Sequence, residues 1–344
     1  MERPPGPGPT LGKKERKMAP QSRPLVSIGI STFNRADGYL REALQSAVDQ
    51  SYPNLEIVVS DNCSEDDTPG VVRGFEDPRI RYCRQSVNIG ANANFNFCLH
   101  EARGEYFLLL HDDDRIDPDL VERCMEAVDF ENGVGLIRTG TRIIDARGVV
   151  RSEAPNRAAG LSTTELLLSW FAGETAFYLC STLYNTGYLK AIGGFQSPRD
   201  LFQDMVATVR LAARYGRVDV EEVKASFRYH GESRGSAARV EAWAEDSLHL
   251  LEVMFEEVPA EDVARVRSEG LRYFTRTNYR HAKEIQGLVE RAKMYWDVYR
   301  RFERSYSPVR YLYSKQLRRL KRLTAPGRNR GRVGASGTAA TQGR

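Results

Sequence analysis

The sequence lacks long hydrophobic runs. Nowhere do its 344 residues approach the roughly 18 consecutive apolar positions of a membrane-spanning helix. The first residues are rich in proline, glycine and lysine and carry no apolar stretch of the kind that a signal peptide needs. We therefore expect a cytoplasmic protein.

Cysteine is also scarce, and its spacing excludes the common cysteine-based sites. The five cysteines are scattered, without the C-x-x-C spacing of zinc or redox motifs. They are typical of small buried hydrophobes in a reducing compartment. The residues concerned are Cys63, Cys83, Cys98, Cys124 and Cys180.

Positive charge is missing from the middle of the chain. The formal net charge is +4, but residues 1–24 and 300–344 are basic and the residues between them are acidic. A nucleic-acid-binding domain needs a basic face on its folded part, so we expect no nucleic-acid partner.

What is present divides the chain into four expected segments. Low-complexity composition predicts a disordered leader over 1–23 and a disordered basic tail over 324–344. Residues 24–236 contain the strands and helices of an α/β domain, and residues 237–323 have the apolar spacing of helices. We expect the helical region to select the acceptor or to pair two chains as a homodimer.

Strand and helix patterns alternate through the first part of the α/β domain. This alternation predicts a mostly parallel sheet covered by helices on both faces. The later part has a looser rhythm, with a capping box at Ser162-Thr-Thr-Glu165 opening one helix and a predicted strand over 176–184. The expected strands of the first part cover 25–31, 55–60, 80–84 and 106–110, and the helices between them 39–49, 69–75 and 93–102.

The stretch Arg310 to Arg322 (R-Y-L-Y-S-K-Q-L-R-R-L-K-R) interleaves basic with apolar residues. Two interpretations stay open. It suits peripheral contact with the inner face of an anionic membrane, and it equally suits a solvated helix end that runs into the tail.

Polar clusters follow three of the predicted strands. They are the segments 31–35, 61–68 and 111–114. Ligands of such sheets bind beyond the carboxyl ends of the strands, although each cluster is also compatible with an ordinary turn or helix cap.

The run Asp112, Asp113 and Asp114 is the sharpest of these clusters. Three adjacent carboxylates repel one another unless they share a cation, and hard oxygen ligands favour Mg²⁺, Mn²⁺ or Ca²⁺. The spacing does not fit an EF-hand, because Asp117 stands where that loop needs glycine. A metal here would stabilise a diphosphate leaving group, which indicates group transfer from a nucleotide.

Four motifs in order carry a family resemblance. P-L-V-S-I-G-I-S-T-F-N-R, E-I-V-V-S-D-N-C-S-E-D-D-T, N-I-G-A-N-A-N-F-N and G-E-Y-F-L-L-L-H-D-D-D resemble the inverting family 2 glycosyltransferases of the GT-A fold, over residues 25 to 235. The resemblance implies a catalytic domain over 24–236, with a nucleotide-binding half (24–130) and an acceptor half (131–236).

The resemblance also implies roles for individual residues. The implied nucleotide-sugar contacts are Thr32, Asn34, Arg35, Asp61, Asn88, Gly90, Asp112, Asp113 and Arg228. The implied ligands of a Mn²⁺ or Mg²⁺ cofactor are Asp114, which is the preferred one, Asp112 and His230.

The general base implied by the family pattern is Asp204, after the Gly193-Gly194-Phe195 motif. Gln203 departs from the glutamate usual at its position, and Asp200 is the competing base. A carboxylate there can take the proton of the acceptor as it attacks the anomeric carbon.

The expected function is thus transfer from a nucleotide diphosphate-sugar donor to a glycan, a lipid-linked intermediate or a small metabolite. Two alternatives are a catalytically silent scaffold with the same fold, which Gln203 favours, and a sugar-nucleotide pyrophosphorylase. The second lacks support, because the segment Thr32 to Arg35 is not the glycine-rich basic loop of that class.

Overall fold

The computed structural model describes residues 23–131, 133–230, 238–314 and 316. The predicted leader, apart from Arg23, and the predicted tail over 324–344 lie outside these residues, as does the basic stretch beyond Gln316. No helix within the described ranges is long and apolar enough to cross a membrane.

The first half of the sheet has the parallel alternation that the sequence predicts. β1, β2, β3 and β4 pair in parallel in the order β3-β2-β1-β4. The elements are β1 (Val26–Thr32), α1 (Leu40–Val48), β2 (Leu55–Asp61), α2 (Thr68–Arg73), β3 (Ile80–Arg84), α3 (Ala91–Glu101) and β4 (Tyr106–His111).

Helices cover both faces of this half because successive side chains of a strand point to opposite faces. On β4, Leu108 and Leu110 pack into the core under α1, α2 and α4 (Leu120–Glu126). Phe107 and Leu109 pack into a second core under α3, α6 (Thr186–Ala191) and α7 (Gln203–Tyr215). The continuous apolar sequence of this strand is therefore explained by burial on both sides.

The second half of the sheet is mixed. β4 pairs antiparallel with β8, β8 with β6, and β6 parallel with β9, which completes a nine-stranded sheet with β5 and β7. The predicted strand over 176–184 is wrong in its first part, where a 3-10 turn at Leu179–Ser181 precedes β8. The strands are β5 (Arg115–Ile116), β6 (Leu136–Ile144), β7 (Val150–Ala154), β8 (Thr182–Asn185) and β9 (Arg217–Arg228).

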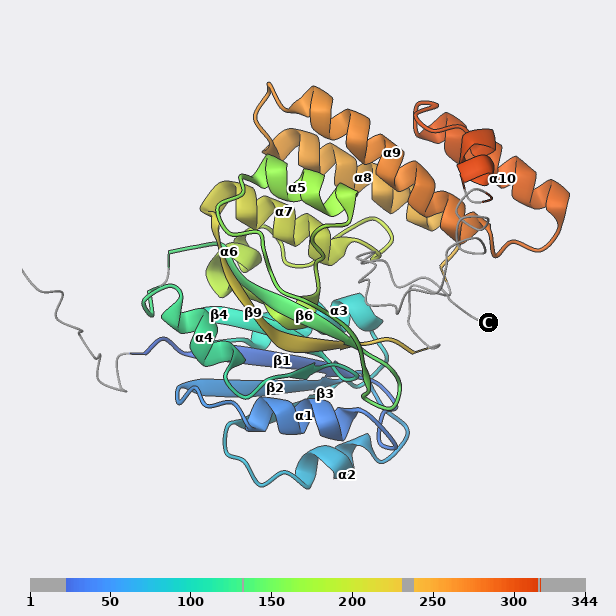
Figure 1. Cartoon of the computed structure of the whole chain (residues 1–344). Helices are drawn as coiled ribbons and strands as arrows, with labels where there is room; N and C mark the ends of the chain where they lie inside the picture. Colours follow the sequence, from blue (N-terminus) through green and yellow to red (C-terminus); the bar gives the residue numbers. More distant parts are fainter. Residues whose placement is uncertain (1–22, 132, 231–237, 315, 317–344) are drawn as a thin grey trace, which may run out of the picture.

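A helical C-terminal lobe packs on the outer surface of α7 and α5 (Thr163–Ala172), whose predicted capping box is present. It consists of α8 (Val240–Glu257), α9 (Val263–Ala282) and α10 (Leu288–Arg301). Aromatic side chains join the two layers, among them Trp170 of α5 and Phe274 of α9, whose ring centroids lie 5.7 Å apart. The prediction of a mixed sheet sandwiched by helices, with a helical C-terminal lobe, is confirmed (Figure 1).

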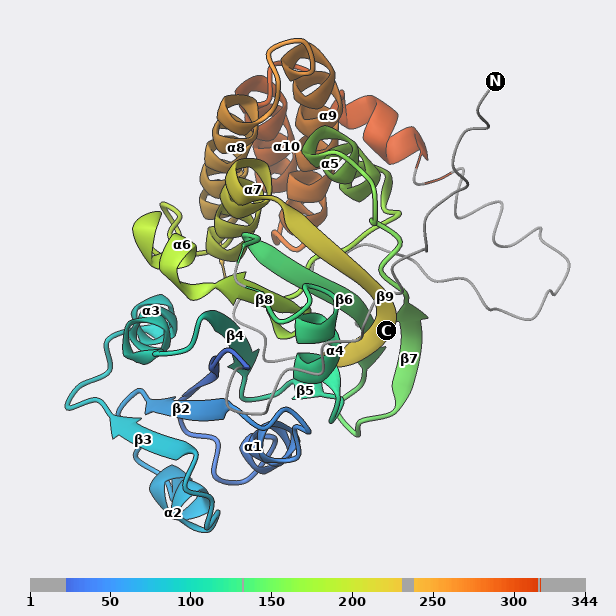
Figure 2. The same ribbon diagram turned by 90° about the vertical axis from the view of Figure 1, so that its left-hand side faces the viewer.

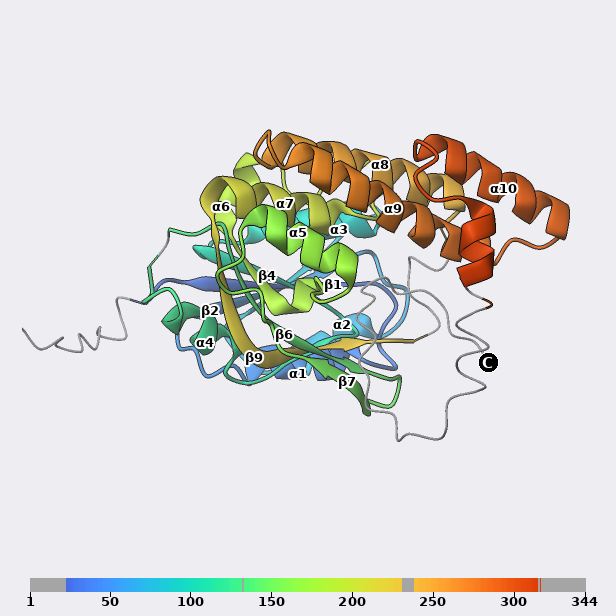
Figure 3. The same cartoon turned by 45° about the horizontal axis from the view of Figure 1, so that its top comes forward.

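The layers follow one another in a simple order. Figure 2 shows α1 and α2 below the sheet and α5 and α7 above it, with α8, α9 and α10 beyond them. Figure 3 shows α8 and α9 lying across the top of α5 and α7. Because these helices cover the two faces of the sheet, the polar loops lie at the edge where the strands have their carboxyl ends.

Candidate active site at the carboxyl ends of the strands

The three polar clusters predicted from the sequence meet at one edge of the sheet. Thr32 at the end of β1 pairs in register with Asp61 of β2, and Ser31 pairs with His111 of β4. Because the three strands are parallel neighbours, their following loops lie side by side.

The loops after β1 and β2 are tied together through the predicted donor-site residues. Asn34 has a positive φ of 52° and accepts a hydrogen bond at Oδ1 from the Glu65 backbone N–H at 2.8 Å. The backbone N–H of Arg35 donates to Thr68 Oγ1 at 3.1 Å, and Arg35 Nε lies 3.8 Å from Asp112 Oδ1. Asn34 thus shapes the loop, while Arg35 links it to the acidic run.

Asp61 is fully buried and its carboxylate is engaged on both oxygens. Oδ1 accepts from the Ser64 backbone N–H at 2.8 Å, and Oδ2 accepts from the Tyr82 hydroxyl. Arg84 Nε lies 3.7 Å from Oδ2. In this arrangement the Asp61 side chain ties the β2 loop to β3, and its predicted contact with the nucleotide stays a prediction.

Asn88 and Gly90 form the turn that enters α3. Asn88 Oδ1 accepts from Asn62 Nδ2 and from the Gly90 N–H, both at 2.9 Å. Gly90 has a φ of 84°, a conformation that glycine adopts without steric cost. The turn is exposed and lies beside the β2 loop, and its predicted place in the wall of a donor pocket stays a prediction.

A possible cation site lies in the loop after β4. Ligand atoms of His111, Asp113 and Asp114 all lie within 4.8 Å of one another. The ring of His111 is stacked on Phe95 of α3 with centroids 5.0 Å apart, which fixes its orientation. Of the predicted ligands, only Asp114 belongs to this cluster, and His111 had been given no metal role.

Asp114 is buried and its negative charge is poorly compensated. Its Oδ1 accepts from the Arg228 backbone N–H at 2.8 Å, and it is 1% exposed. Burial and the charge of Asp113 raise the pKa of Asp114 well above its ordinary value. A divalent cation beside these two carboxylates would remove the repulsion, and carboxylate oxygens suit Mn²⁺ or Mg²⁺.

The other two aspartates of the run differ from Asp114 and from each other. Burial, followed by the charge of Asp113, raises the pKa of Asp112 to about 7. Burial acts to raise the pKa of Asp113 too, but hydrogen bonding from His230 at 2.8 Å and the nearby His111 hold it below its ordinary value. His230 thus contacts a carboxylate of the cluster and is not itself one of the three grouped residues.

Arg228 fastens the end of β9 to this loop. Its Nε donates to the Asp113 carbonyl at 2.7 Å, its Nη2 donates to Glu42 Oε2 at 2.6 Å, and its guanidinium lies 4.1 Å from the Tyr39 ring centroid. The side chain is 1% exposed. This geometry favours a structural role over the predicted phosphate contact, and residues 231–237, which follow His230, lie outside the described residues.

Asp204 is the second residue of α7, and the N-terminal end of that helix lies on the same side of the molecule as the carboxyl ends of β1 and β9 (Figure 1). Burial raises the pKa of Asp204 to about 6, while backbone N–H groups of the helix start act in the opposite direction. Asp200, the competing base, accepts a hydrogen bond from Asn92 Nδ2 at 2.8 Å. Gln203 is buried.

Two asparagines that sequence analysis assigned no role connect the two ends of the site. Asn96 accepts from the Phe195 N–H at 2.8 Å and donates to its carbonyl at 2.9 Å, and Asn92 donates to the same carbonyl at 3.1 Å. A Cβ at Gly194 would lie 2.3 Å from Asn96 Oδ1, which explains the glycine. The i, i+4 spacing of the asparagines on one helix face was the available sequence signal.

Comparison with known proteins finds similarity over the region that contains β1 to β4 and their loops. The family described as Glycosyl transferase family 2 matches residues 27–193. An uncharacterized glycosyltransferase of Rickettsia felis is 28% identical over 260 residues, which cover 74% of this chain and 42% of that protein. A GalNAc(5)-diNAcBac-PP-undecaprenol beta-1,3-glucosyltransferase of Campylobacter jejuni is 32% identical over 158 residues, covering 44% of this chain and 50% of that protein. This chain thus spans half or less of the length of these relatives.

Solved structures agree on the fold. TarS of S. aureus superposes with a TM-score of 0.62 at 16% identity, covering 83% of this chain and 49% of that chain. The mannosyltransferase PcManGT of Pyrobaculum calidifontis, solved with GDP-Man and Mn²⁺, gives a TM-score of 0.50 at 19% identity and covers 91% of each chain. Residues 27–193 thus match the model of glycosyl transferase family 2, and the fold of the chain is of the GT-A type.

Proposed function

We propose that this protein is a metal-dependent, inverting glycosyltransferase that moves a sugar from a nucleotide diphosphate donor to an acceptor hydroxyl. The observation that carries the proposal is the cluster of His111, Asp113 and Asp114 at the edge where the loops of β1, β2 and β4 meet. The negative charge of a diphosphate requires a cation or hydrogen-bond donors, which this cluster would provide. The base and ribose of the nucleotide would contact the neighbouring loops after β1 and β2.

The donor is assigned to the nucleotide-binding half, residues 24–130. The loops that carry Thr32, Asn34, Arg35, Asp61 and Asn88 form its surroundings. Two solved structures of the same fold support a nucleotide-sugar ligand, because TarS 1–349 was solved with UDP-GlcNAc and PcManGT with GDP-Man.

His111, Asp113 and Asp114 would hold the divalent metal, and the sequence-based alternatives Asp112 and His230 stay predictions. When bound, the metal supplies Lewis-acid stabilisation of the departing diphosphate. The protein's part is to hold the two carboxylates together: the Arg228 backbone fixes Asp114, and His230 fixes Asp113.

Asp204 is proposed as the general base. It takes the proton of the acceptor hydroxyl while that oxygen forms a bond to the anomeric carbon, and the bond from this carbon to the nucleoside diphosphate breaks on the opposite face. A single displacement of this kind inverts the anomeric configuration. The pKa of about 6 leaves Asp204 mostly ionised at neutral pH, as a base requires.

The acceptor is assigned to the other half, residues 131–236, with the helical region 237–323 shaping its entry or pairing two chains. A glycan, a lipid-linked intermediate and a small metabolite all fit the chemistry. The Campylobacter relative, whose name specifies a lipid-linked acceptor, supports the second of these.

The test is a panel of UDP-, GDP- and dTDP-sugars, with thermal shift and nucleoside diphosphate release measured with and without Mn²⁺. One donor should stabilise the wild type only with metal and should release its diphosphate. Asp114→Ala should lose the metal-dependent shift. Donor binding without any turnover, over all acceptors tried, would favour the silent scaffold that Gln203 suggests, and no binding of any donor would contradict the proposal.

A further inference from the structure

Asp246 of α8 makes an unusual set of contacts. It is fully buried and accepts four hydrogen bonds, all from the loop that leads into α7. Oδ1 accepts from the Arg199 N–H at 2.7 Å, and Oδ2 accepts from Ser197 Oγ at 2.7 Å. The N–H groups of Leu201 and Phe202 complete the set at 2.8 and 3.2 Å.

This carboxylate holds the backbone that leads into α7. The N-cap residue Phe202 makes no side-chain capping bond, and a helix start leaves backbone N–H groups without partners inside the helix. Asp246 accepts from Phe202 and from the residue before it. The direction in which α7 begins, two residues before Asp204, is therefore set by a side chain of another helix.

The same loop is held on its opposite flank by α3. Asn92 binds Asp200, and Asn96 binds Phe195, as described above. Asp200 adopts a positive φ of 54°, which a non-glycine residue keeps only where its surroundings fix it. Residues 195–204 thus lie between a helix of the donor half and a helix of the C-terminal lobe.

We infer that Asp246 is a positioning residue for the transfer reaction: it holds residues 197–202 so that Asp204 faces the acceptor hydroxyl. The inference rests on the proposed function, since it takes Asp204 as the base. A carboxylate is needed at this position because four hydrogen-bond donors converge on its two oxygens, and an ionised carboxylate accepts hydrogen bonds without donating any. An asparagine would turn an N–H group toward some of those donors.

The test compares Asp246→Asn with Glu245→Gln. Glu245 is the matched control, because it pairs with Arg199 of the same loop through exposed side chains 2.7 Å apart. Asp246→Asn should lower kcat at least about tenfold with the donor KM unchanged, and should move the acid midpoint of the pH profile as the surroundings of Asp204 change. Glu245→Gln should leave both at wild-type values.

Ser197→Ala keeps the inference testable if Asp246→Asn does not fold. It removes one of the four bonds and should lower kcat less, again without affecting the donor KM. A folded Asp246→Asn variant with the kcat and the acid midpoint of the wild type would overturn the inference. If only Ser197→Ala folds, a wild-type kcat in that variant would overturn it. Failure of the proposed function is recognised separately, by full turnover in Asp204→Asn.

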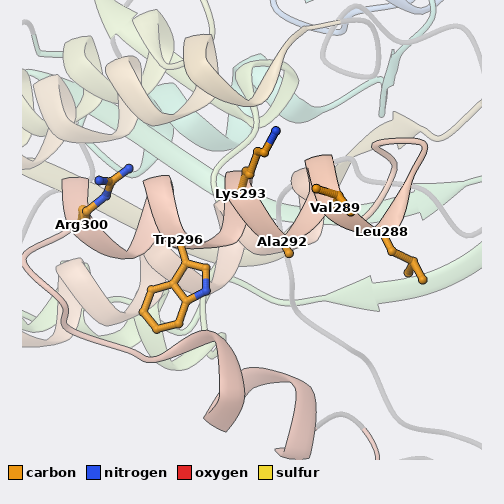
Figure 4. A pocket seen from close by; sticks show the side chains of 6 residues that line it. All are labelled: Leu288, Val289, Ala292, Lys293, Trp296 and Arg300. Atoms are coloured by element: carbon orange, nitrogen blue, oxygen red, sulfur yellow. The ribbon is translucent and has the colours of Figure 1, made fainter.

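A second observation concerns the outer face of α10, where an open cavity of about 640 Å³ is lined by four apolar residues and two cationic ones (Figure 4). Leu288, Val289 and Trp296 are 81%, 66% and 52% exposed. The opposite face of the helix packs into the lobe through Tyr295 and Val298, so the exposed face takes no part in that packing.

The charges beside this face are mixed on α10 and basic in the segment that follows it. Lys293 and Arg300 line the same cavity (Figure 4), and they lie 2.8 Å from Glu290 and 3.8 Å from Asp297 of the same helix. The stretch 310–322 carries basic side chains and no acidic one, and its described part exposes Leu312 and Tyr313. We propose that this face, defined by Leu288, Val289 and Trp296, docks on an anionic lipid surface, where apolar groups enter and cations meet headgroups.

Vesicle co-sedimentation tests this docking face. The wild type should bind phosphatidylglycerol vesicles and not phosphatidylcholine vesicles, and the double variant Leu288→Gln, Trp296→Gln should bind at least about fivefold less. Val149→Gln, an exposed valine elsewhere in the chain, is the control and should bind normally. Equal binding by the double variant, absence of binding by the wild type, or a dimer that the double variant converts to a monomer would overturn the proposal.

Discussion

The loop after β4 and the loop before α7 form the two ends of the proposed site, and they are built in different ways. The β4 loop is held by strands: its register is fixed by β1, and the end of β9 supplies the Arg228 backbone N–H that fixes Asp114. The α7 loop is held by side chains of two helices, Asn92 and Asn96 of α3 and Asp246 of α8.

The β4 loop is positioned by a local sequence pattern, whereas the α7 loop is positioned by contacts with residues that are distant in the sequence. A strand end places a carboxylate through backbone pairing, so the acidic run could be located from the sequence. The base loop depends on individual hydrogen bonds from a lobe that lies beyond the residues matched by the family. Disturbing the two ends should therefore give different kinetic signatures.

The largest effect is expected at the α7 end. Asp204→Asn should lower kcat by about 10²–10⁴-fold while donor binding persists, because the base is lost and the metal cluster is intact. Asp200→Asn is the matched control, and steady-state kinetics distinguishes them. If Asp200→Asn loses activity and Asp204→Asn keeps it, the two carboxylates exchange roles.

The next effect is expected at the β4 end. Removing divalent ions with EDTA, or replacing Asp113 by Ala, should lower kcat/KM about 10²-fold and abolish donor-dependent thermal stabilisation. Calorimetric titration of the donor with and without Mn²⁺ measures it. Unchanged donor affinity in metal-free protein would show that the β4 loop does not need a cation.

A pH profile of kcat, measured with donor and metal at saturating concentrations, reports on the α7 end. Because burial raises the pKa of Asp204 to about 6 and the base acts when ionised, activity should be constant above that pH and fall about tenfold for each unit below it. Donor affinity measured over the same range is the control. An acid midpoint near 4, the ordinary value of an exposed carboxyl, would contradict the assigned environment.

The smallest kinetic effect is expected at Arg228. Arg228→Gln should lower the free energy of unfolding by about 2 kcal/mol, because its ion pair and carbonyl contacts are lost, with little change in donor KM. Denaturant unfolding and donor kinetics measure the two quantities. A large rise in donor KM with unchanged stability would restore the phosphate contact predicted from the sequence.

Much of the first half of the molecule could be predicted. The alternating apolar runs identified β1 to β4, and polar residues after apolar strands identified the site edge. The mixed half was harder, because β5 has two residues and the 3-10 turn at Leu179–Ser181 has the apolar composition of a strand. Neither has a period long enough to recognise.

The site was less predictable than the fold. Asp114 was assigned to the metal, but His111 was not, because which strand-end side chain turns inward depends on packing against Phe95 of another helix. Asp246 reads in the sequence as an ordinary acid of an amphipathic helix. Its role becomes visible only when the loop from Ser197 to Phe202 is folded against it.

The most direct test of the account is the anomeric configuration of the first product, determined by proton NMR before it equilibrates. Direct displacement with Asp204 as base predicts that the configuration is inverted relative to the donor. A product with the donor's configuration retained would contradict both the single displacement and the role given to Asp204.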